Sequence, residues 1–569
     1  MSEERRQFDV LVRHFFGGFL DNDLVSPASD LHGPLSKVVA VVALIGALYP
    51  FRLLLRYGRP FQVYAELDLI SWDDKCTFVM LSLVVMGLLT VLEWDALQLD
   101  RRDCLALGAL PIRSRTVLRA KLAALGKFAL VLSVPLTLLG AMTFPLVMHA
   151  GWSAGWWQAA RTMFAHVTAT LAAAWFAFSC LLAAHSLLQC LFGQRLARRL
   201  AAGVQLVSTL ALVVALLMLP FIASGTAALK RTAAGIGGFA PQMWFMGIYQ
   251  TIAGQGDGDW RLLAVRGWTA LIVTVTVAVA ASVVAYRRVL GTTLEAVQAG
   301  AGGRSWVVRF ANLVARFVAW HPIEHGFFSF TVLTLLRSPW HRVVLAVFFG
   351  VALAVSMVAL DITTYAQDGV HRVPMLASHA LVMQFVILGI VLAGARVAAS
   401  APAELRANWV LRLVESGQPR CWMAGFRKAV FVILVVPVVC AMAMATAAQY
   451  DWRTACAFGA AALAFALVTF EVLFLGFGRV PFACPFDSGS GDPKVRGLVL
   501  VAIFTVIVVP AAELVTLAIR SVTGSTIAVA FGAASVGVLR WRGNLAITRG
   551  GGLAFEPEDQ GSQTLSLGP

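Results

Sequence analysis

The sequence predicts an all-α, polytopic integral membrane protein with about twelve transmembrane helices in two six-helix halves. Of its 569 residues, 59% are hydrophobic and 13% are charged, whereas a soluble domain is about 45–50% apolar and about a quarter charged. Twelve mostly apolar segments approach or exceed the roughly 20 residues that a helix needs to cross a bilayer. Basic connectors recur after every second segment, as expected of cytoplasmic loops.

The twelve segments divide the chain into five regions. The fourth segment is too long for one straight span, so it must tilt, break or extend beyond the bilayer. The segments lie near 35–55, 76–93, 122–149, 160–192, 202–224, 265–286, 342–361, 374–399, 428–448, 455–478, 497–519 and 523–540. The expected regions are a cytoplasmic N-terminal segment (1–34), a first transmembrane half (35–290), a cytoplasmic linker with an elbow helix (291–341), a second half (342–545) and a disordered cytoplasmic tail (546–569).

The N-terminal segment carries apolar residues interrupted by charges, which is unlike a signal peptide. Its pattern predicts an amphipathic helix on the membrane surface, with Phe15, Phe16 and Phe19 on one side.

The distribution of Lys and Arg predicts that both termini lie in the cytoplasm. Connectors 94–121, 287–341 and 400–428 are rich in these residues, whereas 150–156 has none. One loop departs from the rule, because 56–75 is expected outside yet holds Arg56, Arg59 and Lys75. The loop pattern accounts for the net charge of +15, so no nucleic-acid partner is expected. None of the eight cysteines forms a CxxC pair, and their spacing predicts neither a zinc site nor a disulfide framework.

The chain also has the pattern of a topological duplication. A basic connector follows the second span of each half, and Lys121 and Lys428, 307 residues apart, end the two connectors. Parallel halves of this kind are a common transporter design.

Both connectors combine apolar and ionic residues at helical spacing. In the first, Trp94, Leu97 and Arg101 share a face, and Gly108 and Pro111 end the helix. In the second, Leu405, Trp409 and Arg412 share a face before Gly417 and Pro419. Such a helix either lies at the membrane interface without a partner or is bound by another protein. The paired arrangement favours docking, because a symmetric partner needs two equivalent binding sites.

The first connector, "EWDALQLDRRDCLALGALPIRSRTVLRAKL", resembles that of type-2 ABC exporter permeases, especially large bacterial ones with both halves in one chain. The stretches "PQMWFMGIYQTIAG" (241–254), "FSFTVLTLLRSPWHR" (328–342) and "VPFACPF" (480–486) are similar to the same group. The resemblance implies a translocation path in the bacterial cytoplasmic (inner) membrane, with coupling helices near 95–110 and 404–416 on which ATP-binding cassette subunits dock. The residues it assigns to coupling are Trp94, Asp95, Asp100, Arg101, Arg102, Asp103, Arg406, Trp409, Arg412 and Glu415.

The chain carries no phosphate-binding loop of its own. Its one Gly-Lys pair, Gly126-Lys127, is followed by Phe128 within an apolar run, whereas a P-loop needs Ser or Thr there after a glycine-rich turn. We therefore expect no catalytic residue and no cofactor in this chain, with ATP and Mg²⁺ bound by partner subunits. The apolar spans are compatible with a lipid, a hydrophobic drug or a peptide as substrate, and do not choose among them.

Two other functions stay open from the sequence. Ionisable residues within spans could form a polar path for a proton-coupled secondary transporter, or could be hydrogen-bonded contacts between helices. They are Glu471, Glu513, His166, His185 and His379. The stretch "HPIEH" matches an inverted zinc-protease pattern, in which His321 and His325 would bind zinc and Glu324 would act as base. The alternative is that "HPIEH" is the polar start of an elbow helix.

Overall fold

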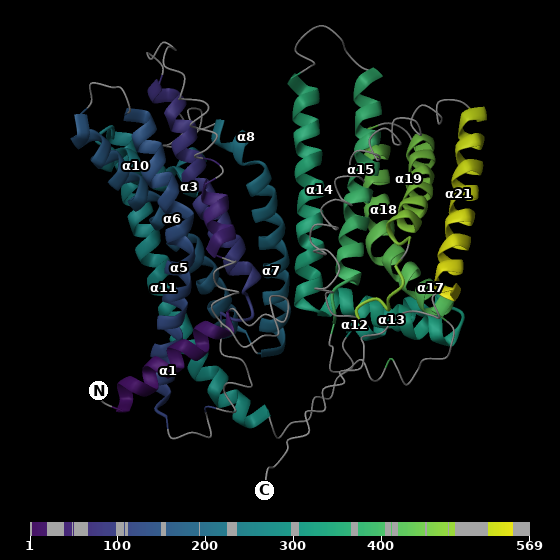
Figure 1. Ribbon diagram of the computed structural model, residues 1–569, viewed down its shortest axis with the longest axis horizontal. Helices are drawn as coiled ribbons and strands as arrows, with labels where there is room; N and C mark the ends of the chain where they lie inside the picture. The colour runs from purple at the N-terminus through teal and green to yellow at the C-terminus, as the bar shows by residue number, and fades with distance from the viewer. Residues whose placement is uncertain are drawn as a thin grey trace. The chain divides into compact units, whose positions relative to one another are not determined.

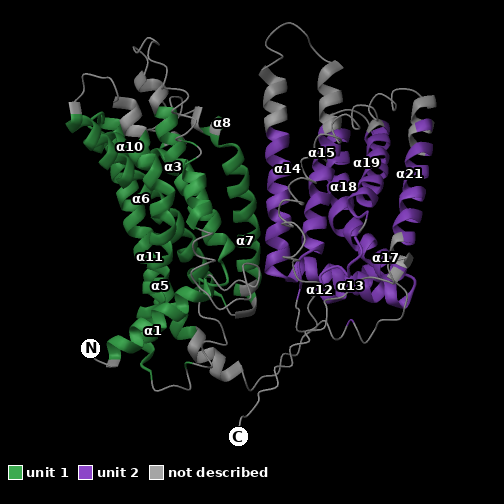
Figure 2. Ribbon diagram, viewed as in Figure 1, with its two compact units in different colours: residues 1–301 green, residues 302–569 purple. Residues whose placement is uncertain are grey.

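Figure 1 shows the computed structural model, in which every long secondary-structure element among the described residues is an α-helix. The chain divides into two compact units, residues 1–301 and residues 302–569, which Figure 2 shows in different colours. The structure describes residues 3–19, 39–47, 49, 67–97, 107, 112–149, 155–192, 194–224, 236–296, 306–365, 374–403, 411, 419–449, 452–475, 477–483 and 522–549.

Unit 1 is a bundle in which the long helix α6 is central, since it packs against α3, α5, α10 and α11. Its core is built of Ala, Val, Leu, Met and aromatic side chains. The helices of unit 1 are α1 (Glu3–Gly18), α3 (Leu67–Leu92), α5 (Ser114–His149), α6 (Gly155–Leu191), α7 (Gln194–Leu217), α8 (Leu219–Ser224), the 3₁₀ turn η1 (Ile236–Phe239), α10 (Pro241–Ala253) and α11 (Gly258–Ala296).

Unit 2 packs its long helices around α15 and α19, while two shorter helices lie across one end of the bundle (Figure 1). The π-helical turn η3 joins α17 to α18 and lies just before Pro437, which has no N–H for a helical hydrogen bond. The helices of unit 2 are α12 (Trp306–Val318), α13 (Pro322–Arg337), α14 (Pro339–Tyr365), α15 (Pro374–Ala399), α17 (Pro419–Val430), η3 (Phe431–Val435), α18 (Val436–Gln449), α19 (Trp452–Leu473) and α21 (Val522–Arg549).

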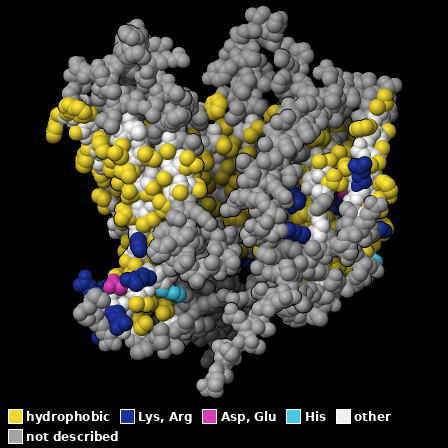
Figure 3. All heavy atoms as spheres, viewed as in Figure 1, with side chains coloured by type: hydrophobic (Ala, Val, Ile, Leu, Met, Phe, Trp, Pro, Cys, Tyr) yellow, Lys and Arg dark blue, Asp and Glu magenta, His cyan; other side chains and the backbone are white. Residues whose placement is uncertain are grey.

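Eight helices among the described residues are long and apolar enough to cross a membrane. Figure 3 shows hydrophobic side chains over the middle of unit 1 and Lys and Arg gathered near α1. The chain is therefore a multi-pass, α-helical membrane protein. The eight spans are Trp72–Leu92, Ser114–Thr143, Trp156–Leu191, Arg199–Leu217, Gly258–Arg288, Pro339–Met357, Arg420–Ala448 and Ala455–Leu473, with a shorter apolar helix at Met383–Ala399.

The remaining expected spans are described to different extents. Residues 39–47 are helical within the segment expected at 35–55, and α21 covers the segment expected at 523–540. The segment expected at 497–519 and the tail at 546–569 lie wholly or mostly outside the described residues. The fourth expected span is α6, one continuous helix of 37 residues. A break in it is therefore excluded, and its length of about 55 Å exceeds the bilayer core, so α6 tilts or extends.

The N-terminal helix forms as predicted, but its aromatic face is covered by protein. Phe15 and Phe16 of α1 are buried in the core of unit 1. Phe19, just after α1, stacks on Phe128 of α5 with ring centroids 4.7 Å apart. The expectation that these rings lie on the membrane surface is wrong, because α5 offers them an apolar partner in Phe128, within the expected third span.

Close helix packing at Gly425 gives a first prediction. A Cβ there would lie 2.6 Å from the backbone oxygen of Glu324, so α13 and α17 must separate to admit it. Gly425→Ala is expected to lower the free energy of unfolding by about 2 kcal/mol, measured by SDS titration of the purified protein. The matched control is Gly126→Ala on α5, which meets no atom within 4 Å and should gain about 0.5–1 kcal/mol. The same gain at Gly425 would contradict the packing.

Candidate coupling region

The first predicted connector begins where α3 ends, and its first residues form a turn. The N–H of Ala96 donates to Glu93 O at 3.0 Å, and the N–H of Leu97 donates to the same oxygen at 3.2 Å. Asp95 is exposed on this turn. The middle of the predicted coupling helix, with Asp100, Arg101, Arg102 and Asp103, lies outside the described residues.

Trp94 anchors this turn in unit 1. Its side chain is buried and stacks on His185 of α6, with ring centroids 4.5 Å apart and planes 12° from parallel. Leu97 is buried in the same apolar cluster. Trp94 therefore supports the connector from inside and does not present a surface to a partner, and His185 packs with it.

Lys121 fixes the same turn from α5. Its Nζ donates to Ala96 O at 2.7 Å and lies 5.2 and 4.9 Å from the ring centroids of Phe15 and Phe19. A charge-assisted hydrogen bond of this kind is stronger than a neutral one. The start of the connector, the end of α1 and the start of α5 are thus held together as one packed structure.

The second predicted connector also begins on a fixed support. The N–H of Phe482 donates to Ala399 O at 3.0 Å, and the N–H of Ala403 donates to Phe482 O at 2.8 Å. Phe482 is buried and has a φ of 64°, a left-handed conformation that a bulky residue adopts only where its surroundings enforce it. His341 Nε2 lies 3.3 Å from Ala401 O. Arg406, Trp409, Arg412 and Glu415 lie outside the described residues.

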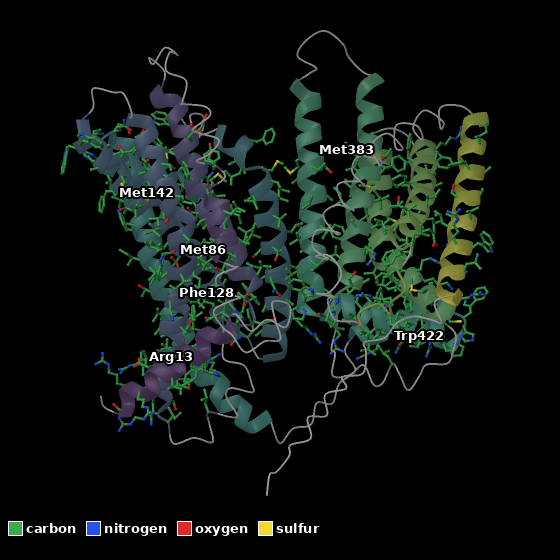
Figure 4. The ribbon with its side chains drawn as sticks, viewed as in Figure 1. Arg13, Met86, Phe128, Met142, Met383 and Trp422 are labelled. Atoms are coloured by element: carbon green, nitrogen blue, oxygen red, sulfur yellow. The ribbon has the colours of Figure 1, made fainter. Side chains whose placement is uncertain are left out.

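Lys428, the residue 307 positions after Lys121, makes a similar pair of contacts. Its Nζ donates to Val318 O of α12 at 2.8 Å and forms an ion pair with Glu324 of α13. The ring of Trp422 on α17 stacks on Phe327 at 5.3 Å, at the end of the bundle where Figure 4 labels Trp422. In each unit, then, the lysine that ends the basic connector donates to a main-chain carbonyl and lies against an amphipathic helix.

The same ion pair bears on the zinc hypothesis. Glu324, the expected general base, is engaged with Lys428. Within the described ranges, no group of three or more His, Cys, Asp or Glu side chains could hold a metal ion. "HPIEH" instead forms the N-terminus of α13, with Pro322 in its first turn and Glu324 buried near the lysine.

The expected intramembrane path is not assembled by the described residues. Glu471 of α19 lies 3.0 Å from Arg427 Nε of α17 and 2.8 Å from Arg540 Nε of α21, so it joins three helices of unit 2. His166 is buried in unit 1, between the rings of Phe78 (4.7 Å) and Tyr249 (5.7 Å). His379 lies on α15 but its side chain is not described, and Glu513 falls outside the described residues.

A polar cluster in unit 1 was missed by the sequence reasoning. Lys75 lies within α3 and is buried, not in a loop. Its Nζ donates to Gln255 Oε1 at 3.0 Å, and Tyr49 Oη donates to Asp74 Oδ1 at 2.6 Å. Lys75 is therefore no loop cation, which removes one of the three exceptions to the orientation rule. The run "DDK" directly before an apolar segment was the available signal.

Fold and connectors define an α-helical, multi-pass membrane protein with buried supports under two connectors. No protein-family model matches the sequence, and neither a curated protein nor a solved structure is significantly similar to it.

Proposed function

We propose that the chain is the membrane-spanning permease subunit of an ATP-driven ABC exporter in the bacterial inner membrane. The proposal includes twelve spans in two six-helix halves, with both termini in the cytoplasm. ATP and Mg²⁺ bind to ATP-binding cassette subunits supplied by other chains, and the substrate is unidentified. Its support is the resemblance of the first connector and of three other stretches, at 241–254, 328–342 and 480–486, together with the way in which the structure holds the start of each connector.

The observation that carries the proposal is the anchoring of both connectors. A helix that transmits movement from a partner must be fixed to the spans, because a loosely attached loop would absorb the displacement. Trp94 and Lys121 supply that fixation in unit 1, and Phe482 and His341 supply it in unit 2. Each anchored turn leads directly into residues assigned to coupling, such as Arg101 and Arg406.

In this mechanism the chain performs no covalent chemistry. ATP binding and hydrolysis in the partners displace the two connectors, and the spans alternate between inward-open and outward-open arrangements. Rigid attachment at Lys121 passes the displacement of the first connector to α5. The second connector leads along the chain into α17, and α5 and α17 begin the third span of each half.

The experiment is a mild-detergent pull-down of the tagged protein from its host, with partners identified by mass spectrometry. A stoichiometric partner with a P-loop is expected. Arg101→Glu/Arg102→Glu should release it, or uncouple its ATPase activity from transport, without unfolding the permease. A solitary permease, or unchanged coupling in the double variant, would count against the proposal.

The alternative is a proton-coupled secondary transporter, favoured by the burial of His166 within a span. Glu471 gives it less support, because its side chain forms ion pairs with Arg427 and Arg540. Substrate flux that follows a proton gradient without ATP would establish this alternative. His166→Ala would then abolish the proton-driven flux.

A further inference from the structure

The helix α12 of unit 2 uses one face for packing within the protein. Ala311, Ala315 and Ala319 recur every four residues and are buried. They form one cluster with Phe328 and Val332 of α13 and with Ala429 of α17. The small alanines let α12 lie close to α13, so this face fixes the position of α12.

A second face of α12 is apolar and exposed. The side chains of Leu313, Phe317 and Trp320 are 55%, 76% and 88% exposed. Spacings of three and four residues place Phe310, Leu313 and Phe317 on one side of the helix. Trp320 follows two residues after the helix ends at Val318. Large aromatic residues in such a row are costly to leave in water.

The charges beside this apolar stripe are all positive. Arg309 and Arg316 are exposed and each directly precedes one of the aromatic residues. The sequence of α12, WVVRFANLVARFV, contains no acidic residue. Asn312, also exposed, accepts a hydrogen bond from Ser329 Oγ at 3.2 Å. An apolar stripe flanked by arginines matches an anionic bilayer surface, with acyl chains below and phosphate groups beside them.

The N-terminal amphipathic helix α1 provides a contrast. The aromatic face of α1 is buried against α5, and its exposed side chains mix Arg5 and Arg6 with Glu4. The sequence pattern of α1 is therefore satisfied within the protein. In α12, by contrast, only the alanine face is buried within the protein, and the exposed face is apolar and basic.

We propose that α12 is a lipid-binding helix, which inserts Leu313, Phe317 and Trp320 into the membrane interface and holds anionic phospholipid headgroups with Arg309 and Arg316. The position of α12 fits this occupant. It lies across the end of the bundle (Figure 1), and α13 alone separates it from the span that begins at Pro339. Tryptophan and arginine are the residues typically found at this depth. The binding does not depend on the exporter assignment.

The test compares the full-length protein in nanodiscs of phosphatidylcholine and of a 7:3 mixture with phosphatidylglycerol, by hydrogen–deuterium exchange of peptides covering 306–320. An arginine near an anionic surface favours binding about fivefold. Amide exchange in α12 should therefore be slower in the anionic discs by up to about 25-fold. Arg309→Gln/Arg316→Gln should abolish the difference, while unchanged exchange in α14 and α15 shows that the variant is folded.

The matched control is Arg5→Gln/Arg6→Gln on α1, which should leave the lipid dependence of α12 intact. Phe317→Ser/Trp320→Ser should speed exchange in both lipid compositions, because it removes the apolar contribution. Equal exchange in both compositions for the unaltered protein would overturn the proposal. Protection of α12 only when another protein co-purifies would overturn it too, and would assign the stripe to that protein.

Discussion

Glu471→Gln is expected to lower the free energy of unfolding by about 3 kcal/mol. The Glu471 side chain is 8% exposed and neutralises two cations, Arg427 and Arg540, whose side chains are 23% and 40% exposed. Removing one member of a buried ion pair typically costs about 3–5 kcal/mol, because the remaining charge stays buried without its counter-ion. The lower end applies here, since both arginines reach some water. SDS titration with helical content as the signal measures the loss.

The control for this prediction is Arg540→Gln. Arg540 is the more exposed arginine, and its loss leaves Glu471 paired with Arg427, so a cost of about 1 kcal/mol is expected. Equal and small effects of both variants would mean that water screens the cluster. A transport assay on Glu471→Gln distinguishes a structural role of Glu471 from a role in proton transfer. A folded variant that loses only its proton dependence would favour the secondary transporter.

The helices of this protein were largely predictable because hydrophobic composition alone marks a span. Runs such as 76–93 and 455–478 contain so few charges that a bilayer or a core is their only stable surrounding. The structure places a long helix on each. Two short helices, α10 and α12, have no such mark, since each is too short to span a bilayer. Part of their packing also comes from distant segments, α6 for α10 and Ala429 of α17 for α12.

The sites were harder to predict than the helices, for a physical reason. Periodicity identifies an apolar face, but it does not say whether lipid, protein or a partner covers that face. Trp94 and Phe15 both lie on correctly identified faces, yet each is buried against another helix of unit 1. Lys75 was assigned to a loop because a cation seldom lies in a span, and its hydrogen bond to Gln255, 180 residues away, has no local signature.

Trp94→Ala is expected to lower the free energy of unfolding by about 3–5 kcal/mol and to weaken coupling at the first connector. The cost follows from the cavity that a buried tryptophan leaves, here between the end of α3 and His185 of α6. Trp94→Phe should cost less than about 1.5 kcal/mol, because stacking on His185 is kept and the indole Nε1 has no hydrogen-bond partner among the described residues.

The two Trp94 variants therefore differ in packing, and the second measurement compares how well each couples ATPase activity to transport. If the anchored turn transmits movement, Trp94→Ala in a stabilising detergent should retain partner binding and basal ATPase activity, yet lose most substrate-stimulated activity. Trp94→Phe should behave like the unaltered protein. Trp156→Ala, at an 86% exposed site on α6, should change neither stability nor coupling. A stable Trp94→Ala protein with full coupling would show that the connector moves independently of its anchor, and would remove the observation on which the proposed function rests.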